Sequence, residues 1–134
     1  MEGFARLKLL LDTHIWLWTQ IDPMRLRHRV TRLLKDPHNE MWLSPVSTWE
    51  ALALHKKGRV ELDGTLTEWV GAATLGFKEA FLTHEIALAS LDFSAHKDPS
   101  DRLIAATAKV LNLTLVTADE RLLGLPGIKT LANS

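Results

Sequence analysis

Four acidic residues, spread along the 134-residue chain, are candidates for metal binding and catalysis. They are Asp12, Glu50, Asp101 and Asp119. Carboxylate oxygens are hard ligands. In a chain without cysteine or closely spaced histidines they select Mg²⁺, with Mn²⁺ as a second choice, over zinc. A bound divalent cation lowers the pKa of a water molecule and so prepares it for hydrolysis. Metal-assisted hydrolysis is therefore the chemistry that these residues would support, provided that the fold brings them together.

Two of these acids come just after short apolar segments. Residues 7–11 end directly before Asp12, and residues 113–117 are followed by Ala118 and Asp119. A short apolar run of this kind is typical of a parallel-sheet strand that is buried on both faces. Both acids are therefore predicted at the carboxyl ends of strands.

The other two acids are predicted in the first turns of helices. One helix is expected to begin at Ser47 and to run to about residue 57, with Gly58 as its end, which places Glu50 in its first turn. The longest helical pattern covers residues 98–111 and begins with an aspartate followed by a proline, so Asp101 also lies near a helix start.

The remaining segments alternate between strand and helix patterns, which predicts an α/β fold of a single domain over residues 1–134. Strands are expected at residues 41–44, 77–82 and 128–131, and helices at residues 14–20, 24–35, 66–75 and 84–91, with a helical turn ending at residue 123. In such a fold a parallel sheet is covered by helices on both faces, and its connections are right-handed. The carboxyl ends of the strands then share one edge, where the four acids would meet.

Each acid also has a purely structural interpretation as a helix cap. Asp12 and Asp119 precede predicted helices, Ser47-x-x-Glu50 has the form of a capping box, and Asp98-Pro99 has the form of an aspartate cap. A cap stabilises a helix by about 1 kcal/mol. Two carboxylates ~4 Å apart repel each other by roughly 4 kcal/mol at an effective dielectric near 20. A cluster of ionised acids would therefore need a cation or shared protons, whereas dispersed caps would not.

Composition limits the other classes of protein. The formal net charge is zero, with 16 Lys and Arg against 16 Asp and Glu, so no global basic field points to duplex DNA. The chain has neither a cysteine nor a segment that resembles a signal peptide or a membrane span, and we expect it in the cytoplasm. It also lacks a P-loop, a G-x-G-x-x-G turn and a G-x-S-x-G motif, which argues against nucleotide cradling and serine hydrolysis.

Local clusters of positive charge remain as candidates for phosphate contacts. One lies within residues 25–35 and the other within residues 55–59, although solvated helix faces and helix C-termini are the favoured explanation of both. The five tryptophans are expected in the core or at an interface rather than as base-stacking platforms. His96 is expected to pack or to cap a helix rather than to act as a catalytic base.

Four sequence blocks, taken in order, resemble the PIN-domain family, and more narrowly the VapC-type toxins of bacterial toxin–antitoxin pairs. They are residues 10–14 (LLDTH), Ser47-x-x-Glu50 ahead of Gly58-Arg59, residues 96–108 (HxDPxDRxIAAxA) and residues 115–119 (LVTxD). The similarity extends from about residue 8 to residue 131. Asp101 matches the third acid of the family best, with Asp98 as an accessory.

The resemblance implies a three-layer α/β/α fold and a Mg²⁺-dependent ribonuclease that is homodimeric and is inhibited by a small antitoxin wrapped in an apolar groove. On this basis Asp12, Glu50, Asp101 and Asp119 are the expected catalytic residues and metal ligands. Asp98 and Thr117 would orient ligands or water, and Arg102 would pair with an acid or touch phosphate. Two alternatives remain: a PIN-like nuclease of RNA processing or DNA cleavage outside a toxin system, and a non-catalytic PIN-like binding module.

Overall fold

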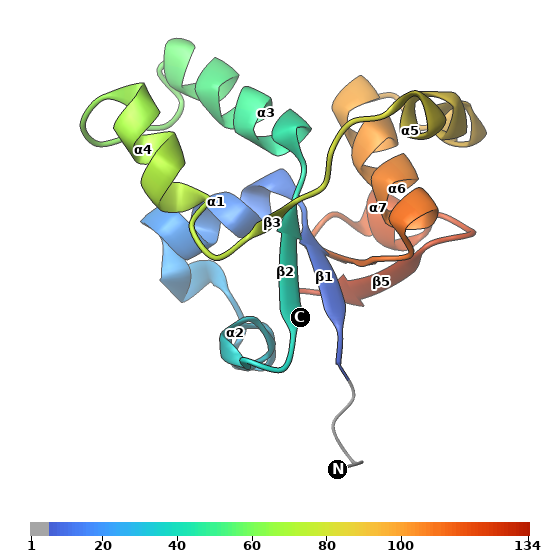
Figure 1. The fold of residues 1–134 in the computed structure, drawn as a ribbon, viewed down its shortest axis with the longest axis horizontal. Coiled ribbons are helices and arrows are strands. Elements are labelled where there is room, and N and C mark those ends of the chain that lie inside the picture. The colour runs from blue at the N-terminus through green and yellow to red at the C-terminus, as the bar shows by residue number, and fades with distance from the viewer. Residues whose placement is uncertain (1–5) are drawn as a thin grey trace.

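A sheet of five parallel strands forms the middle layer of the computed structural model, which describes residues 6–134 (Figure 1). The strands are β1 (Lys8–Leu11), β2 (Glu40–Leu43), β3 (Lys78–Glu79), β4 (Thr114–Thr117) and β5 (Lys129–Ala132). Their spatial order is β3-β2-β1-β4-β5, and every neighbouring pair is parallel. The predicted α/β architecture is confirmed.

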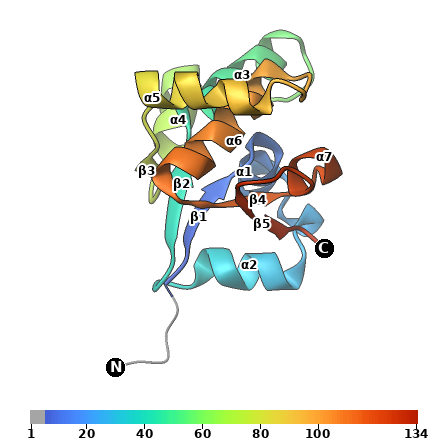
Figure 2. The same ribbon diagram turned by 90° about the vertical axis from the view of Figure 1, so that its right-hand side faces the viewer.

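Seven α-helices connect and cover these strands in the described part of the chain (Figures 1 and 2). They are α1 (Thr13–Ile21), α2 (His28–Lys35), α3 (Pro45–Lys56), α4 (Leu66–Ala73), α5 (His84–Ala89), α6 (Pro99–Leu111) and α7 (Glu120–Leu123), with 3₁₀ turns at Pro23–Arg25 and Ser90–Phe93. Within residues 6–134, no helix is long and apolar enough to cross a lipid bilayer.

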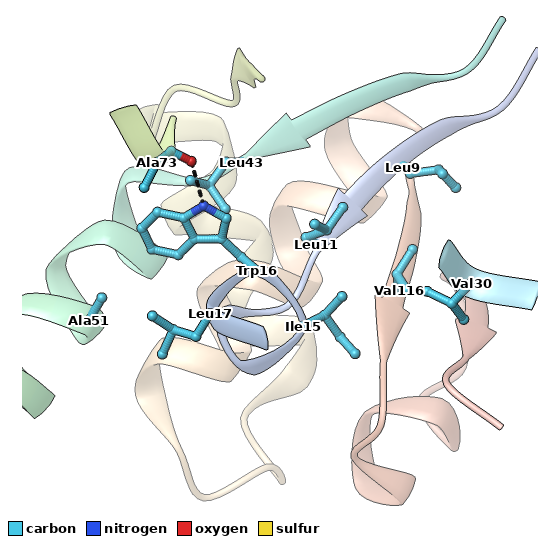
Figure 3. Packing of buried hydrophobic residues seen from close by; sticks show 10 residues of the cluster. All are labelled: Leu9, Leu11, Ile15, Trp16, Leu17, Val30, Leu43, Ala51, Ala73 and Val116. Atoms are coloured by element: carbon cyan, nitrogen blue, oxygen red, sulfur yellow. Dashed lines mark hydrogen bonds between the residues drawn. The ribbon is translucent and has the colours of Figure 1, made fainter. Parts of the chain in front are cut away.

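The central strand β1 is buried on both faces, as its apolar sequence predicts. Leu9 and Leu11 pack into one core with residues of α1, α2 and α3, whereas Leu10 packs into a second core with residues of α6 and α7. The first core is centred on Trp16, whose indole Nε1 donates a hydrogen bond of 2.9 Å to the carbonyl oxygen of Ala73 (Figure 3). Helices on both faces of the sheet give the predicted three layers.

The predicted helix over residues 24–35 is interrupted at Leu26 and Arg27, which have extended backbone angles. Asn133, near the other end of the chain, explains the break. Its side chain donates a hydrogen bond to the carbonyl of Arg25 (3.0 Å) and accepts one from the backbone N–H of Arg27 (2.8 Å). These contacts satisfy backbone groups that a continuous helix would have paired within itself, so the long-range contact prevails over the local pattern.

Helix α3 begins earlier than predicted. Ser44 is its N-cap and accepts a hydrogen bond from the backbone N–H of Val46 (3.0 Å), with Pro45 as the first helical residue. The interpretation of Ser47-x-x-Glu50 as a capping box is therefore wrong, and Glu50 lies in the second helical turn instead of the first. The predicted end of the helix is confirmed, because Gly58 follows Lys57 with the left-handed φ of +75° that glycine adopts readily.

Two other boundaries differ from the sequence prediction. The strand expected at residues 77–82 shrinks to β3, two residues that pair with Trp42 and Leu43 of β2. The helix expected at residues 84–91 ends as α5 and continues as a 3₁₀ turn. Both segments are mostly exposed apart from the buried Ala80 and Ile86, and both carry weak periodicity, so tertiary packing determines their ends.

Candidate active site

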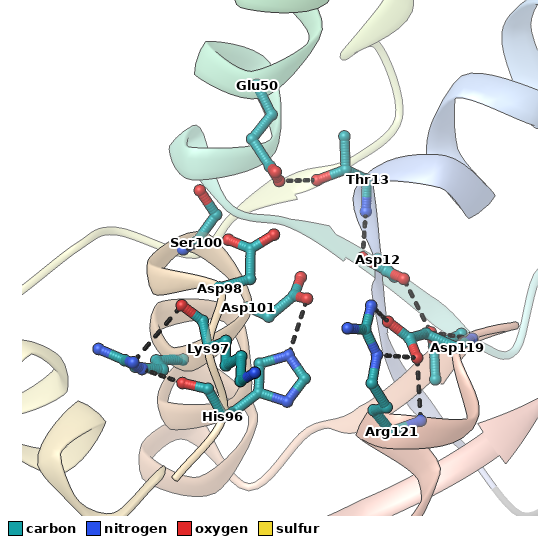
Figure 4. Close-up of polar contacts among 12 residues, drawn as sticks. Asp12, Thr13, Glu50, His96, Lys97, Asp98, Ser100, Asp101, Asp119 and Arg121 are labelled. Carbon is teal, nitrogen blue, oxygen red and sulfur yellow. Dashed lines mark hydrogen bonds and ion pairs between the residues drawn. The ribbon is translucent and has the colours of Figure 1, made fainter. Parts of the chain in front are cut away.

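The predicted acids converge on one cavity of about 300 Å³, next to the carboxyl ends of β1 and β4 (Figure 4). Asp12, Glu50, Asp98, Asp101 and Asp119 all line it. Thr13, His14, Trp18, Ala118 and Arg121 complete the wall. The central expectation from the sequence, that acids distant in the chain meet at one sheet edge, therefore holds in the structure.

Asp12 is the most buried acid of the cavity, with only 6% of its surface exposed. It caps α1 by accepting a 2.8 Å hydrogen bond from the backbone N–H of Thr13. Its other oxygen accepts a 2.7 Å hydrogen bond from the hydroxyl of Thr117. Burial raises the pKa of Asp12, and the charge of Asp101 adds to this increase, while the Thr117 hydrogen bond opposes it. Asp12 is thus both a cap and a functional candidate.

Glu50 reaches the cavity from α3, where it meets the start of α1. The hydroxyl of Thr13 donates a 2.5 Å hydrogen bond to Glu50 Oε1 and also lies 2.9 Å from the hydroxyl of Ser47. Burial raises the pKa of Glu50, the Thr13 hydrogen bond opposes this, and the nearby charges of Asp101, Asp98 and Asp12 raise it further. Glu50 is therefore not a helix cap but a residue of the cavity wall.

Asp98 and Asp101 enter from α6 and have different partners. Asp98 is the N-cap and accepts a 2.9 Å hydrogen bond from the backbone N–H of Ser100, as predicted. Asp101 lies in the first turn of the helix, as predicted, and its Oδ2 is 3.0 Å from Nε2 of His96. The His96 side chain is only 5% exposed. Burial raises the pKa of Asp101, and the neighbouring charge of Asp98 adds to this, whereas His96 opposes it.

Asp119 differs from the other acids because a cation already faces it. It caps α7 by accepting a hydrogen bond from the backbone N–H of Arg121, whose guanidinium also lies 3.2 Å from Asp119 Oδ2. Partial burial raises the pKa of Asp119, but the hydrogen bonds and the charge of Arg121 outweigh it, so the net shift is downward. The side chain of Arg121 is 72% exposed.

Arg102 takes a different position from the one expected. Its Nε donates to the backbone carbonyl of His96, and its Nη2 lies 3.5 Å from the carbonyl of Lys97. Neither contact involves an acid, and Arg102 does not line the cavity wall. Among residues 6–134 the expected pairing of Arg102 with an acid is therefore not found, whereas its contact with phosphate stays a prediction. Arg102 instead holds the loop that carries His96.

Thr117, expected to orient ligands, connects two of the acids. It donates to Asp12 and accepts a 3.0 Å hydrogen bond from the backbone N–H of Asp119. The contributions of Thr13 and Arg121 were missed in the sequence. Both were within reach of sequence reasoning, since Thr13 directly follows the strand-end acid and Arg121 lies two residues after a predicted cap.

The donor set of the cavity suits a hard divalent cation. It consists of carboxylate oxygens, and burial and mutual repulsion raise the pKa of three of these groups, so a bound cation would favour their ionised forms. Within residues 6–134, no three His, Asp or Glu side chains are arranged to hold a metal ion directly. Mg²⁺ binding with several retained waters is compatible with this spacing, because Mg²⁺ dehydrates reluctantly and usually binds through few carboxylates.

Comparison with known proteins gives an independent assignment. The PIN domain family matches residues 9–127 of this chain. The chain is similar to Ribonuclease VapC22 of Mycobacterium tuberculosis, with 29% identity over 116 residues that cover 85% of this chain and 88% of the relative.

Solved structures show the same fold. VapBC2 from Rickettsia felis, bound to a DNA fragment from its promoter, aligns with a TM-score of 0.73 and 14% identity over 96% of this chain and 100% of that chain. A toxin–antitoxin complex from Klebsiella pneumoniae aligns with a TM-score of 0.63 and 22% identity over 94% of this chain and 98% of that chain. At these identities the likeness establishes the fold.

Proposed function

Because this chain belongs to the PIN domain family, we propose that its acidic cavity is the active site of a metal-dependent ribonuclease. One observation carries the proposal. Asp12, Glu50 and Asp101 come from three different helices or helix starts, line one cavity, and all have raised pKa values. Helix capping explains Asp12 but neither Glu50 nor Asp101, which supports a functional role for the cluster. The similarity to Ribonuclease VapC22 supports RNA as the substrate.

Asp12, Glu50, Asp101 and Asp119 would hold one or two Mg²⁺ ions, directly or through water, with Mn²⁺ as a substitute. Bound there, the ion would supply a low-pKa water and neutralise the charge that develops on the phosphodiester. The chain's own residues position these groups. Thr117 orients Asp12, and Asp98 adds negative charge at the rim.

His96 fixes Asp101 from outside the cavity, because its Nε2 meets one carboxylate oxygen and leaves the other free. Arg121 is the cation of the wall and would contact the phosphate when it leaves Asp119. Cleavage by an activated water needs no covalent intermediate on the protein.

Within this class, we infer that the chain acts as the toxin of a toxin–antitoxin pair in the cytoplasm, as a homodimer. The VapBC2 structure and the Klebsiella pneumoniae toxin–antitoxin complex, which share the fold, support a cognate antitoxin. A second cavity, of about 430 Å³, lies between α3 and α4 and is lined mainly by apolar side chains, including Trp49, Leu52, Val70 and Phe77. Trp49 is 64% exposed, which is unusual for a large aromatic side chain and supports a partner at this groove.

Cleavage of a single-stranded RNA by the purified chain tests the enzymatic proposal. We expect activity with Mg²⁺, none in EDTA, and at least a hundredfold loss in Asp12→Asn, because this change removes a charge from the cavity. Asp63→Asn, a change at an exposed acid outside the cavity, is the matched control and should cleave normally. Activity that survives EDTA, or equal activity in Asp12→Asn, would refute the assignment.

Expression in growing cells separates the toxin from its alternatives. A toxin arrests growth, and one small co-expressed partner relieves the arrest. A nuclease of RNA processing or DNA cleavage would remain active in vitro without such a partner. A non-catalytic binding module would neither cleave RNA nor respond to Mg²⁺ in a thermal melt.

A further inference from the structure

A basic surface adjoins the acidic cavity at the junction between α1 and α2. A cavity of about 460 Å³ lies there, and its wall includes Trp18, Arg25, Arg27 and His28. The side chains of Arg25, Arg27 and His28 are solvent-exposed. We call this set of four residues the basic surface.

The basic surface is continuous with the acidic cavity through Trp18. This residue lines both cavities and is only partly buried. The guanidinium carbon of Arg25 lies 4.7 Å from the centre of the Trp18 ring. On the other side, the ring of His14, which lines the acidic cavity, is 6.3 Å from the ring of Trp18. A row of planar groups therefore runs from the acids to the arginines.

The charge of this region differs from that of the whole chain. Residues 18–35 contain five Arg or Lys residues and a single acid, Asp22, although the complete chain has no net charge. The other basic cluster of the sequence, residues 55–59, lines neither cavity. Of the two clusters of positive charge in the sequence, only the one at residues 25–35 therefore lies next to the acidic cavity.

The backbone of the basic surface is held in place by a distant part of the chain. Asn133 binds the backbone groups of Arg25 and Arg27, and the guanidinium of Arg29 donates a 2.9 Å hydrogen bond to the carbonyl of Ala132. The side chains of Arg25 and Arg27 take no part in the Asn133 contacts. They are therefore presented on a preorganised backbone, which favours binding because little ordering is needed.

We propose that the basic surface binds the single-stranded RNA that enters the acidic cavity. Arg25 and Arg27 contact phosphates, and an unpaired base stacks on the aromatic pair Trp18 and His14. The acidic cavity by itself repels a polyanion, so affinity for the strand has to come from neighbouring cations. This inference rests on the proposed ribonuclease function and adds the path that the substrate follows.

Binding of a fluorescein-labelled single-stranded RNA of about 12 nucleotides, measured by fluorescence anisotropy in Mg²⁺ and in an Asp12→Asn background, tests the proposal. The test variant is Arg25→Ala/Arg27→Ala, and Lys56→Ala/Lys57→Ala is the control with the same loss of charge. Each lost phosphate contact should weaken binding roughly fivefold at 0.1 M salt and reduce the slope of log K against log salt by about 0.7. The control should bind like the parent.

A second pair of variants tests stacking. Trp18→Phe keeps an aromatic face and should retain binding, whereas Trp18→Leu should weaken it by about five- to a hundredfold. Circular dichroism verifies the fold of each variant. An equal loss of RNA affinity in Trp18→Phe and Trp18→Leu would overturn the stacking role of Trp18.

The possible failures are distinct. If the otherwise wild-type chain cleaves RNA and Arg25→Ala/Arg27→Ala binds and cleaves equally well, the basic surface is refuted and the ribonuclease stands. If the wild-type chain does not cleave RNA and neither the Asp12→Asn parent nor the lysine control binds it, the ribonuclease proposal fails as well. If the arginine variant keeps RNA binding but loses a co-expressed protein partner, the surface serves that protein and the proposal is overturned.

Discussion

The hydroxyl of Thr117 donates a 2.7 Å hydrogen bond to the carboxylate of Asp12, across 105 positions of sequence. Leu11 of β1 and Val116 of β4 are register partners in the sheet. The residues that follow them, Asp12 and Thr117, therefore lie next to each other at the carboxyl ends of these two strands. Both are buried. The contact joins the two central strands at the point where the cavity begins.

Thr117→Val should destabilise the fold and lower activity, because it preserves shape while leaving a buried carboxylate oxygen without its donor. We expect the free energy of unfolding to fall by about 1–3 kcal/mol in urea denaturation. Thr117→Ser retains the hydroxyl and should keep most of the activity. If Thr117→Val is tolerated and Thr117→Ser is not, packing of the methyl group matters and the hydrogen bond does not.

His96→Leu should reduce cleavage by about ten- to a hundredfold, because Asp101 loses the group that orients it. His96→Gln offers a donor at a similar distance and should restore a large part of the activity. The affinity for Mn²⁺, measured by electron paramagnetic resonance, should fall in the His96→Leu variant and recover in the His96→Gln variant. An unchanged affinity in both variants would mean that His96 serves only the packing of its loop.

Without metal, stability should decrease as the pH rises. The pKa values of Asp12, Glu50 and Asp101 are raised in the folded chain, so the folded state binds more protons than the unfolded state above the ordinary carboxyl range. The free energy of unfolding then falls as the pH passes from the ordinary carboxyl values through the raised ones. Thermal melts in EDTA across this range measure the effect.

Mg²⁺ should reverse this loss of stability, because a bound cation favours the ionised acids. In Asp12→Asn the slope against pH should be shallower, since one of the raised groups is gone. Asp119 has the opposite effect, because its pKa is lowered in the folded chain. Its contribution to the free energy of unfolding is present at neutral pH and is lost only below the ordinary carboxyl range. Stability that rises with pH above the ordinary carboxyl range would contradict the prediction.

Arg121→Gln should strengthen Mn²⁺ binding in the absence of RNA, because the guanidinium competes with a metal ion for Asp119. Exposed ion pairs are weak, so we expect an increase in affinity of at most about fivefold. Arg121→Lys keeps the charge and should change little. Weaker Mn²⁺ binding in Gln would show that Arg121 supports the site instead of competing for it.

The sequence alone was enough to predict the helix and sheet layers of this fold and the acidic residues that line its cavity. Short apolar segments ending near Asp12 and Asp119 predict strands that finish at one edge, and Asp98-Pro99 predicts the start of α6. These signals are local, because burial on both faces and helix capping are each recorded within a few neighbouring residues.

Tertiary structure alone decided which partners these residues have. Ser44 in place of Ser47 caps α3, His96 meets Asp101, Asn133 interrupts the helix expected at residues 24–35, and Trp18 joins two cavities. Several of these features depend on contacts between residues distant in sequence, and all depend on the direction in which side chains point after packing. Periodicity and spacing carry no information on that direction, so only the folded chain reveals how its acids are held.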